Sequence, residues 1–367
     1  MIKDKNKVLF IIPSLNPGGI ETYTLRFLRY AKDGIDPYII VRSKAKGELY
    51  EDYLKETKNL FFIPLGSFNL LNIIKYFNLF RKLKPIAVVD FNANFAGLPM
   101  FIAKMAGIKK RITFYRQGKN HYTTSFLKNS YNLFVNKLVF KFATSILANS
   151  QAAIDFFFHY RNSTDLRFEV ITNGVNISDY SFEETKDSIK TDLNIPKEKF
   201  IIGHVGRLDP AKNHTTILKV AQELIKKNKG VHFVFCGIET EKIYPLAKEL
   251  NIEKHITILG FRRDIPRVLK SFDLFFFPSL TEGQPNALIE AMVSNIEIVS
   301  SNIPPILECV PKSKHSNLFN PKDVARFEKA ICAVLENQNQ KSPSIIEEVK
   351  LKFDSSTNFK LFLNKLI

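Results

Sequence analysis

The sequence predicts an α/β protein built from two doubly wound parallel sheets. Short runs of β-branched and phenylalanine residues alternate with amphipathic stretches of helix length, which is the pattern of βαβ units. The alternation stops once, near residues 176–197, and then resumes. A chain of 367 residues is too long for one ordinary core and long enough for two. We therefore expect two Rossmann-like domains in tandem.

Each run can be assigned in chain order. In the first half we expect strands at Val8–Leu15, Tyr38–Arg42, Leu60–Pro64, Ala87–Phe91, Arg111–Tyr115, Ser145–Ala148 and Phe168–Ile171, with helices such as Gly19–Ala31, Leu70–Leu83 and Phe126–Phe142. In the second half we expect strands at Phe200–Val205, His232–Cys236, Ile256–Leu259, Leu274–Phe277 and Glu297–Val299. The helices expected there are Thr215–Lys226, Lys242–Leu250, Ile265–Ser271, Ala287–Ser294 and Val324–Leu335.

The interruption at Asn176–Lys197 is rich in Ser, Asp, Glu and Lys, which indicates an interdomain connection or its edge. We place the first domain at residues 1–178 and the second at 179–352. The tail from Phe353 to Ile367 predicts a final amphipathic helix, with Asp354 or Ser355 as its N-cap.

The bulk composition limits the classes of partner. Lys and Arg number 53 against 36 Asp and Glu, a formal net charge of +17, which favours nucleic acid, nucleotide phosphates or an anionic membrane surface. No clustered basic run or nucleic-acid motif occurs, so nucleic acid is not an expected partner.

Three widely spaced cysteines indicate free thiols in a reducing compartment. No apolar run reaches the roughly 18 residues of a membrane span, and the first apolar stretch lacks a signal-peptide pattern, so we expect a cytoplasmic protein.

Two strand-to-helix turns are candidate anion sites, because ligands of parallel α/β domains bind at the carboxyl ends of strands. Gly18 and Gly19 follow the first strand and open a helix, so backbone N–H groups can approach an anion closely. A tight turn without a ligand fits this pattern equally well. Gly206 follows the first strand of the second half, and Arg207 and Lys212 can both reach one anion there. The alternative is two surface cations on a loop.

A third candidate turn follows the strand Phe275–Phe277. Pro285 suits a helix start, and the N–H groups of Asn286, Ala287 and Leu288 should be free at that N-terminus. Glu282 lies in the loop and Glu290 about one turn inside the helix, where a carboxylate can accept both hydroxyls of a ribose. A surface glutamate and an unrelated helix glutamate would give the same spacing.

The sequence contains no Asp-x-Asp and no His-x-x-x-His, so no metal or other cofactor is expected. A diphosphate would then be neutralised by protein cations and helix ends, which Arg207, Lys212 and the two turns provide.

The three turns, in this order and spacing, resemble family 4 of the retaining glycosyltransferases, which have the GT-B fold. The matching segments span nearly the whole chain and are Gly18-Gly19-Ile20-Glu21, Asn173-Gly174-Val175, Gly206-Arg207…Lys212-Asn213, Leu259-Gly260-Phe261 and Phe277-Pro278-Ser279…Glu282-Gly283…Glu290-Ala291-Met292. The resemblance is carried mainly by the second domain. It implies two Rossmann-like domains facing a cleft, with the last helix packing back on the first domain.

The resemblance also implies roles for single residues. Arg207 and Lys212 are expected to bind the donor pyrophosphate, Glu290 the ribose, and Glu282 to lie near the transferred sugar, so Arg207, Lys212 and Glu282 are the candidate catalytic residues. Gly18 and Gly19 are expected to close on the phosphate from the other domain. The remaining residues assigned to the donor are Gly206, Phe261, Arg262, Pro285, Asn286, Ala287 and Leu288.

One departure concerns the acceptor. Many family members carry histidines after two strands of the first domain, where this chain reads Val89-Asp90-Phe91-Asn92-Ala93 and Thr113-Phe114-Tyr115-Arg116-Gln117. The acceptor-side candidates are therefore Asp90, Asn92, Arg116 and His121.

The function implied by the resemblance is metal-independent, retaining transfer of a sugar from a nucleoside diphosphate, UDP for preference. The expected acceptor is a hydroxyl of a growing glycan or lipid-linked glycan of a bacterial surface polysaccharide. Another GT-B enzyme, such as a nucleotide-sugar epimerase or a phosphorylase, is the alternative, and the Arg207…Lys212 and Glu282…Glu290 pairs argue against it. Segments Phe68–Lys84 and Phe126–Phe142 mix apolar and basic residues, so they could rest on an anionic membrane or be ordinary helices with solvated lysines.

Overall fold

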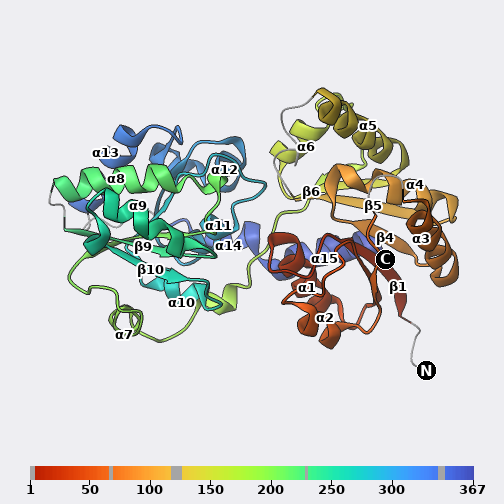
Figure 1. Cartoon of the computed structure of the whole chain (residues 1–367), viewed down its shortest axis with the longest axis horizontal. Helices are drawn as coiled ribbons and strands as arrows, with labels where there is room; N and C mark the ends of the chain where they lie inside the picture. The colour runs from red at the N-terminus through yellow and green to blue at the C-terminus, as the bar shows by residue number, and fades with distance from the viewer. Residues whose placement is uncertain (1–4, 66–68, 117–125, 228–229, 338–343) are drawn as a thin grey trace. The chain divides into compact units, whose positions relative to one another are not determined.

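The computed structural model describes residues 5–65, 69–116, 126–227, 230–337 and 344–367, and side chains are described except at 126–129 (Figure 1). These residues divide into two compact units. Unit 1 extends to Gly174 and includes Ser355–Ile367, and unit 2 is Val175–Asp354. Each unit contains one parallel sheet, as the alternating sequence pattern predicts.

Unit 1 has a seven-stranded sheet in the order β3-β2-β1-β4-β5-β6-β7, in which every neighbouring pair is parallel. Its strands are β1 Asn6–Ile12, β2 Ile35–Val41, β3 Leu60–Phe62, β4 Ala87–Asp90, β5 Lys110–Tyr115, β6 Ser145–Ala148 and β7 Phe168–Val170. Its α-helices are α1 Gly19–Ala31, α2 Tyr50–Glu56, α3 Leu70–Leu83, α4 Gly97–Met105, α5 Phe126–Phe142, α6 Gln151–Phe157 and α15 Ser355–Leu366. Helices α1, α2 and α15 pack on one face and α3 to α6 on the other (Figure 1).

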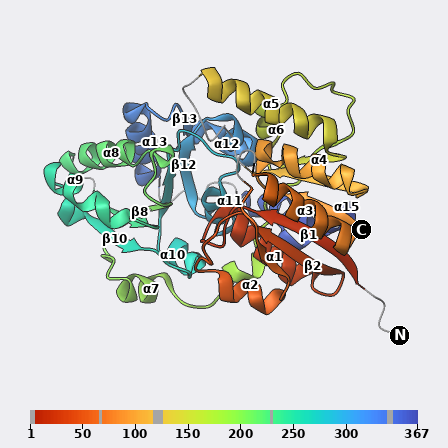
Figure 2. The same cartoon turned by 45° about the vertical axis from the view of Figure 1, so that its right-hand side comes forward.

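Unit 2 has a six-stranded sheet in the order β10-β9-β8-β11-β12-β13, again with parallel neighbours. Its strands are β8 Phe200–Val205, β9 Val231–Cys236, β10 Ile256–Gly260, β11 Leu274–Phe277, β12 Glu297–Ser301 and β13 Leu318–Phe319. Its α-helices are α7 Lys186–Asp192, α8 His214–Lys226, α9 Tyr244–Glu249, α10 Ile265–Lys270, α11 Asn286–Val293, α12 Pro304–Cys309, α13 Val324–Glu336 and α14 Ile346–Phe353. Helices α8, α9 and α13 cover one face (Figure 2), and the other α-helices of the unit cover the opposite face.

The boundary between the units differs from the expected one. The chain leaves unit 1 at Gly174 and not at residue 178, because Val175 is buried in unit 2 and pairs there with Asp354. The segment expected to be an interdomain connection or its edge lies within unit 2. Ile189 and Leu193 are buried in its core, since α7 packs beside α10.

The final helix expected over Phe353–Ile367 is present as α15, and a helix that was not predicted, α14, precedes it. Helix α14 ends at Phe353 in unit 2, and α15 begins at Ser355 in unit 1. Phe359 and Phe362 of α15 contact Phe27 of α1, with ring centroids 5.7 and 4.6 Å apart. This aromatic contact buries the apolar face that the amphipathic pattern of the tail predicts.

The first strand is shorter than expected at its carboxyl end. It stops at Ile12, because Pro13 has no N–H to donate to the sheet. The chain therefore enters the turn before α1 earlier than the apolar run suggests. Strand β13 and helices α7, α12 and α14 of unit 2 were not among the predicted elements.

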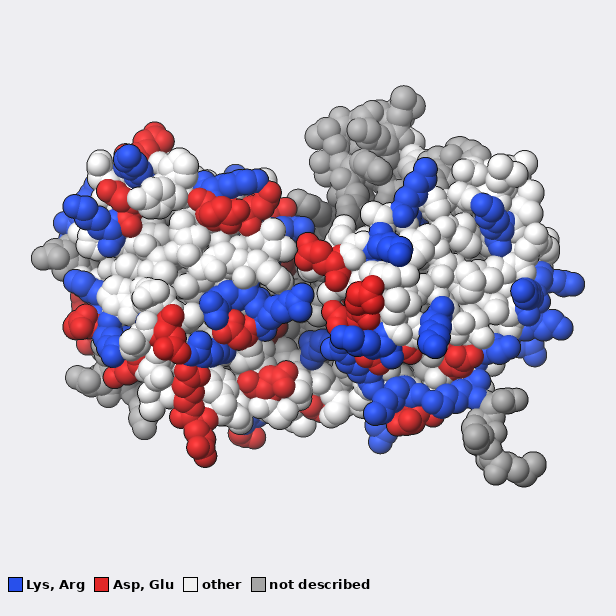
Figure 3. Space-filling view, turned by 60° about the horizontal axis from the view of Figure 1, so that its bottom comes forward, with Lys and Arg blue, Asp and Glu red and all other residues white. Residues whose placement is uncertain are grey.

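The positive charge is spread over both units. On the face drawn in Figure 3, Lys and Arg side chains are interspersed with Asp and Glu. This mixture is typical of solvated surfaces and does not resemble the continuous basic groove of a nucleic-acid-binding protein.

Candidate active site

The donor-side candidates of unit 2 lie at the point where the order of the strands in its sheet reverses, between β8 and β11. Strand β8 lies between β9 and β11, so the loops that follow β8 and β11 emerge side by side at the carboxyl edge. The first of these loops carries Gly206, Arg207 and Lys212, and the second carries Glu282 and leads into α11, which contains Glu290.

Local hydrogen bonds fix the loop after β8. The Asp209 carboxylate accepts from the Ala211 N–H at 2.8 Å, and Asn213 adopts a left-handed conformation with φ of 59°. The Asn213 amide donates to the carbonyl of Pro278 at 2.9 Å, and the Leu280 N–H donates to the Ala211 carbonyl at 2.8 Å. The loop after β8 is therefore tied to the segment after β11.

The two predicted cations differ in their environment. The Arg207 side chain is 67% exposed, and its Nε lies 3.8 Å from the Asp209 carboxylate. The Lys212 ammonium is 2.7 Å from Glu282 Oε1, and these side chains are 23% and 9% exposed. The structure thus brings Lys212 and Glu282 together, while Arg207 remains accessible to an anion. The Arg207 N–H has no acceptor among the described residues.

The start of α11 is a second source of positive potential. Pro285 is its cap residue, and no side chain caps the helix. The Asn286 N–H donates to the Gln284 carbonyl at 3.0 Å and is not free as expected, whereas within the described residues the N–H groups of Ala287 and Leu288 have no acceptor. The macrodipole adds attraction for an anion at this end. Glu290 lies one turn further along and is half-buried.

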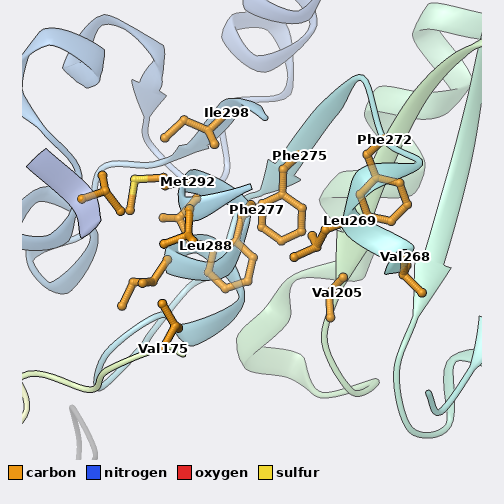
Figure 4. Packing of buried hydrophobic residues seen from close by; sticks show 14 of the residues in the cluster. Val175, Val205, Val268, Leu269, Phe272, Phe275, Phe277, Leu288, Met292 and Ile298 are labelled. Carbon is orange, nitrogen blue, oxygen red and sulfur yellow. The ribbon is translucent and has the colours of Figure 1, made fainter. Parts of the chain in front are cut away.

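The Leu288 side chain serves the core. It is fully buried and packs with Phe277 and Met292 in the cluster drawn in Figure 4. Its contribution to a ligand is limited to the backbone N–H. The same packing holds α11 against β11 and so fixes where the free N–H groups point.

The two candidates after β10 face solvent to different degrees. Phe261 is 52% exposed and follows Gly260, the last residue of the strand. The Arg262 guanidinium donates to both oxygens of Asp264, at 2.8 and 2.6 Å. The Asp264 carboxylate therefore already engages the Arg262 guanidinium, whereas the Phe261 ring is open to solvent.

Sequence reasoning missed Gly237, which follows β9. Its φ is 151°, and a Cβ there would lie 2.2 Å from the Gly206 carbonyl oxygen. Any larger residue would displace the loop that carries Arg207. The signal available in the sequence was a glycine directly after a strand, at the same edge as Gly206.

Sequence reasoning also missed two histidines beneath the loop after β8. His204, in β8, is 1% exposed, and His214, the first residue of α8, is 6% exposed. Burial and the nearby Lys212 lower the pKa of His214 to about 4. The neighbouring Asn213 and Lys212 belonged to a recognised motif, but nothing in the sequence marks the histidines as a pair.

Unit 1 places Gly18 and Gly19 at the start of α1, as expected. Gly18 is the cap residue in an extended conformation with no side-chain cap, and in the described part of the chain the N–H groups of Gly19 and Ile20 have no acceptor. Glu21 is buried behind them and accepts from the Ser14 hydroxyl at 2.8 Å. Burial raises the pKa of the Glu21 carboxyl.

The acceptor-side candidates lie at the carboxyl edge of the unit 1 sheet. Asp90 is fully buried, and its Oδ1 accepts from the N–H and from the side-chain amide of Asn92, both at 2.7 Å. Burial raises the pKa of Asp90. Asp90 and Asn92 therefore bind each other, although Asp90 Oδ2 has no partner in the residues that the structure describes.

Arg116 follows the next strand, β5. Its guanidinium lies 3.5 Å from the centroid of the Tyr23 ring and donates to the side chain of Asn173. Burial lowers the pKa of Arg116 to about 10, so it remains charged at neutral pH. His121 lies outside the described residues.

Two kinds of feature are absent from the residues that the structure describes. These residues contain no group of three or more His, Cys, Asp or Glu side chains arranged to hold a metal ion. In the same ranges, no helix has both the length and the apolar composition that crossing a bilayer requires.

Family models match both halves of the chain. Residues 17–179 match the model described as Glycosyltransferase Family 4, and residues 185–351 match Glycosyl transferases group 1. The boundary between the matches falls close to the boundary between the two units.

Individual relatives extend the match over most of the chain. The capsular polysaccharide biosynthesis glycosyltransferase CapH of Staphylococcus aureus is 28% identical over 81% of this chain and 81% of its own length. The UDP-Gal:alpha-D-GlcNAc-diphosphoundecaprenol alpha-1,3-galactosyltransferase of Escherichia coli is 25% identical, over 78% of this chain and 77% of its own. HepE of Anabaena, solved in complex with UDP and glucose, superposes with a TM-score of 0.83 at 19% identity, covering 98% of this chain and 99% of HepE.

Proposed function

Because this chain belongs to family 4 of the glycosyltransferases, with the GT-B fold, we propose that it transfers a sugar from UDP to a hydroxyl of a growing or lipid-linked glycan in surface polysaccharide biosynthesis. The observation that carries the proposal is the arrangement of unit 2. Arg207 and the Lys212–Glu282 pair lie beside the uncapped start of α11 at the switch point of the sheet. This arrangement provides positive charge for a diphosphate and a carboxylate beside it.

We propose that the reaction needs no metal and retains the anomeric configuration, as the family resemblance implies. The bond between the anomeric carbon and the phosphate oxygen breaks, the acceptor oxygen bonds to the same face, and its proton passes to the leaving phosphate. Arg207, Lys212 and the N–H groups of Ala287 and Leu288 stabilise the charge that develops on the leaving diphosphate. Glu290 binds the ribose hydroxyls, and the exposed Phe261 ring offers a face for the base.

A thermal-shift screen across UDP-, GDP-, ADP- and dTDP-sugars tests the donor. A ligand present at 100 times its Kd adds about 2.7 kcal/mol to the free energy of unfolding. For a domain of this size that corresponds to a rise in Tm of roughly 5–10 °C. We expect this rise with UDP-sugars and a smaller one with the other donors. A screen in which no nucleoside diphosphate sugar raises Tm would contradict the proposal.

The acceptor side is proposed from the relatives. The Escherichia coli relative is named for a diphosphoundecaprenol acceptor, and we extend a lipid-linked acceptor and a cytoplasmic, membrane-peripheral location to this chain. Helix α3 exposes Leu70, Leu71 and Ile74, which are 67%, 72% and 47% accessible. Exposed apolar side chains on a helix whose last turn carries Arg81 and Lys82 are typical of proteins that rest on an anionic bilayer.

A basic cavity adjoins α3 at its C-terminal end. It has a volume of about 520 Å³ and is lined by Arg81, Lys84, Lys109 and Lys110, among other residues. Lys110 donates to the carbonyls of Leu366 and Ile367, and the other three cations have no ion pair with the described residues. This charge supports an anionic surface as the partner of unit 1.

We expect sedimentation with phosphatidylcholine vesicles only when phosphatidylglycerol is added, and less of it at high salt. Arg81→Ala/Lys84→Ala/Lys109→Ala should weaken the binding on the order of 100-fold, since each cation near an anionic surface contributes about 1 kcal/mol. The matched control removes three exposed cations of unit 2, Lys226, Lys227 and Lys248. Binding that is insensitive to anionic lipid, or lost equally in both triple variants, would reject a membrane role for this cavity.

A further inference from the structure

The loop that carries Arg207 and Lys212 starts and ends at a buried pair of histidines. His204 precedes the loop in β8, and His214 follows it at the start of α8. Their ring centroids are 4.9 Å apart and their planes are 79° apart, an edge-to-face contact. The pair therefore closes the base of the loop beneath the proposed diphosphate site.

The contacts of His204 determine which of its nitrogens carries the proton. Nδ1 lies 3.0 Å from the Phe276 carbonyl oxygen, which can only accept a hydrogen bond. Burial, His214 and Lys212 hold the pKa of His204 well below its usual value, so the ring is neutral near pH 7. The proton is therefore on Nδ1, and Nε2 is a bare acceptor.

The bare nitrogen lies at the loop. Nε2 has no hydrogen-bond partner among the described residues, and a Cβ on Gly206 would lie 3.0 Å from it. The Cγ and Cδ atoms of Lys212 lie 3.4 Å from that same point. His204 Nε2, Gly206 and the aliphatic stem of Lys212 thus meet at one place. Buried acceptors in folded proteins usually have a donor, so Nε2 is available to a donor that comes within reach.

The Lys212 ammonium and the His204 ring both lie near Phe277. In this structure the ammonium binds Glu282 Oε1 at 2.7 Å and lies 5.0 Å from the centroid of the Phe277 ring. The His204 ring stacks near the same phenylalanine, at 5.7 Å between centroids. An ammonium has three N–H groups, so it can bind one nitrogen and two phosphate oxygens at once. A bound diphosphate would compete with Glu282 for it.

We propose that His204 is a positioning residue for Lys212. When a nucleoside diphosphate binds, Nε2 accepts one ammonium N–H of Lys212 and directs the other two at the phosphates. Glu282 is then released to face the donor sugar. This inference rests on the proposed function, which assigns Lys212 to the diphosphate, and it adds the group that orients it.

Two substitutions separate the nitrogens of His204. In His204→Asn the amide nitrogen takes the place of Nδ1 and retains the bond to Phe276, while the acceptor at the Nε2 position is lost. In His204→Gln an amide oxygen can reach the Nε2 position and retain the acceptor. Isothermal titration with UDP measures Kd for wild type, for both variants, and for each of the three in a Lys212→Ala background.

We expect His204→Asn to weaken UDP binding about 10-fold and His204→Gln to remain within about 3-fold of wild type, as a hydrogen bond to a charged donor predicts. In the Lys212→Ala background, His204→Asn should change Kd less than about 2-fold, because the group it orients is gone. An equal loss in both backgrounds would show that His204 acts only on the structure and would overturn the inference, as would no loss in either. In those cases UDP still binds, so the proposed function stands; absence of any nucleoside diphosphate binding by wild type would overturn both.

A measurement on the wild-type protein covers the case in which His204→Asn does not fold. The ¹⁵N resonance of His204 Nε2 reports whether this nitrogen is bare or accepts a hydrogen bond. We expect it to move upfield when UDP is added and to stay in place when UDP is added to Lys212→Ala. An Nε2 resonance that is unchanged by saturating UDP in wild type would overturn the inference.

Discussion

Replacing Arg207 and Lys212 together with alanine is expected to lower kcat/KM for sugar transfer by roughly four orders of magnitude. Removing one group that stabilises developing charge typically costs 10²–10³-fold, and here both side-chain cations proposed for the leaving diphosphate are lost. The measurement is transfer of labelled sugar from a UDP-sugar to an acceptor glycan. Activity at the wild-type level in the double variant would contradict the assignment of the donor site.

The single variants separate catalysis from stability. The Arg207 side chain is 67% exposed, so Arg207→Ala should change the free energy of unfolding by less than about 0.5 kcal/mol while activity falls. Lys212→Ala leaves the Glu282 carboxylate, 9% exposed, without its cation and should cost about 1–3 kcal/mol. A matched control is Lys219→Ala/Lys248→Ala, which removes the same charge from two exposed side chains of unit 2 that have no ion pair with the described residues. It should retain both activity and stability.

Acid is expected to destabilise unit 2 strongly between pH 6.5 and about pH 4. Burial lowers the pKa of His214 and of His232 to about 4, and it also lowers the pKa of His204. The unfolded chain therefore binds protons at these histidines before the folded chain does, so stability is complete above pH 6.5 and is lost as pH falls. A depression of this size corresponds to on the order of 3 kcal/mol for His214 or His232.

Calorimetry of the full chain from pH 7.5 to pH 4.5 measures this loss. His232→Gln removes one titrating ring while offering an amide to Thr257, which His232 Nε2 contacts at 2.8 Å. It should make the loss smaller by roughly 3 kcal/mol at the acid limit. His159→Gln, at an exposed position of unit 1, is the control for replacing a histidine. An identical acid dependence in His232→Gln and wild type would contradict this account.

In unit 1, two buried carboxyls should make the folded state more stable as pH falls, which is opposite to the effect of the histidines in unit 2. Burial raises the pKa values of Asp90 and Glu21, so the folded unit binds their protons more readily than the unfolded chain does. Their contribution to stability therefore increases as pH falls through the raised values. These two carboxyls therefore oppose the acid destabilisation that the buried histidines cause in unit 2.

Much of the donor side followed from residues close together in the sequence. Arg207 and Lys212 lie on one loop, and the start of α11 was marked by Pro285 and a Phe-rich strand. That Lys212 meets Glu282, 70 residues away, depends on the adjacency of β8 and β11. No local sequence pattern predicts that β8 and β11 are neighbours in the sheet.

For some of the residues expected to bind the donor, the structure shows a neighbouring group that already engages the side chain or the N–H. Arg262 is held by Asp264, and Leu288 is a core residue whose backbone alone can bind a ligand. Asn286 donates its N–H to a neighbouring carbonyl. Residue type and spacing predict which groups can bind an anion, but a group already engaged by a neighbour is recognised only from the coordinates.

The sequence by itself determined that this chain alternates strands and helices in two halves, because hydrophobic periodicity and strand-ending glycines are local properties. It also determined the family, since the motifs hold their order and spacing. Tertiary structure decided the rest. It ended unit 1 at Gly174, returned α15 to α1, and placed His204 and His214 beneath the Arg207–Lys212 loop. These outcomes depend on which buried surfaces meet, and pairings between residues distant in the chain leave no periodic signal.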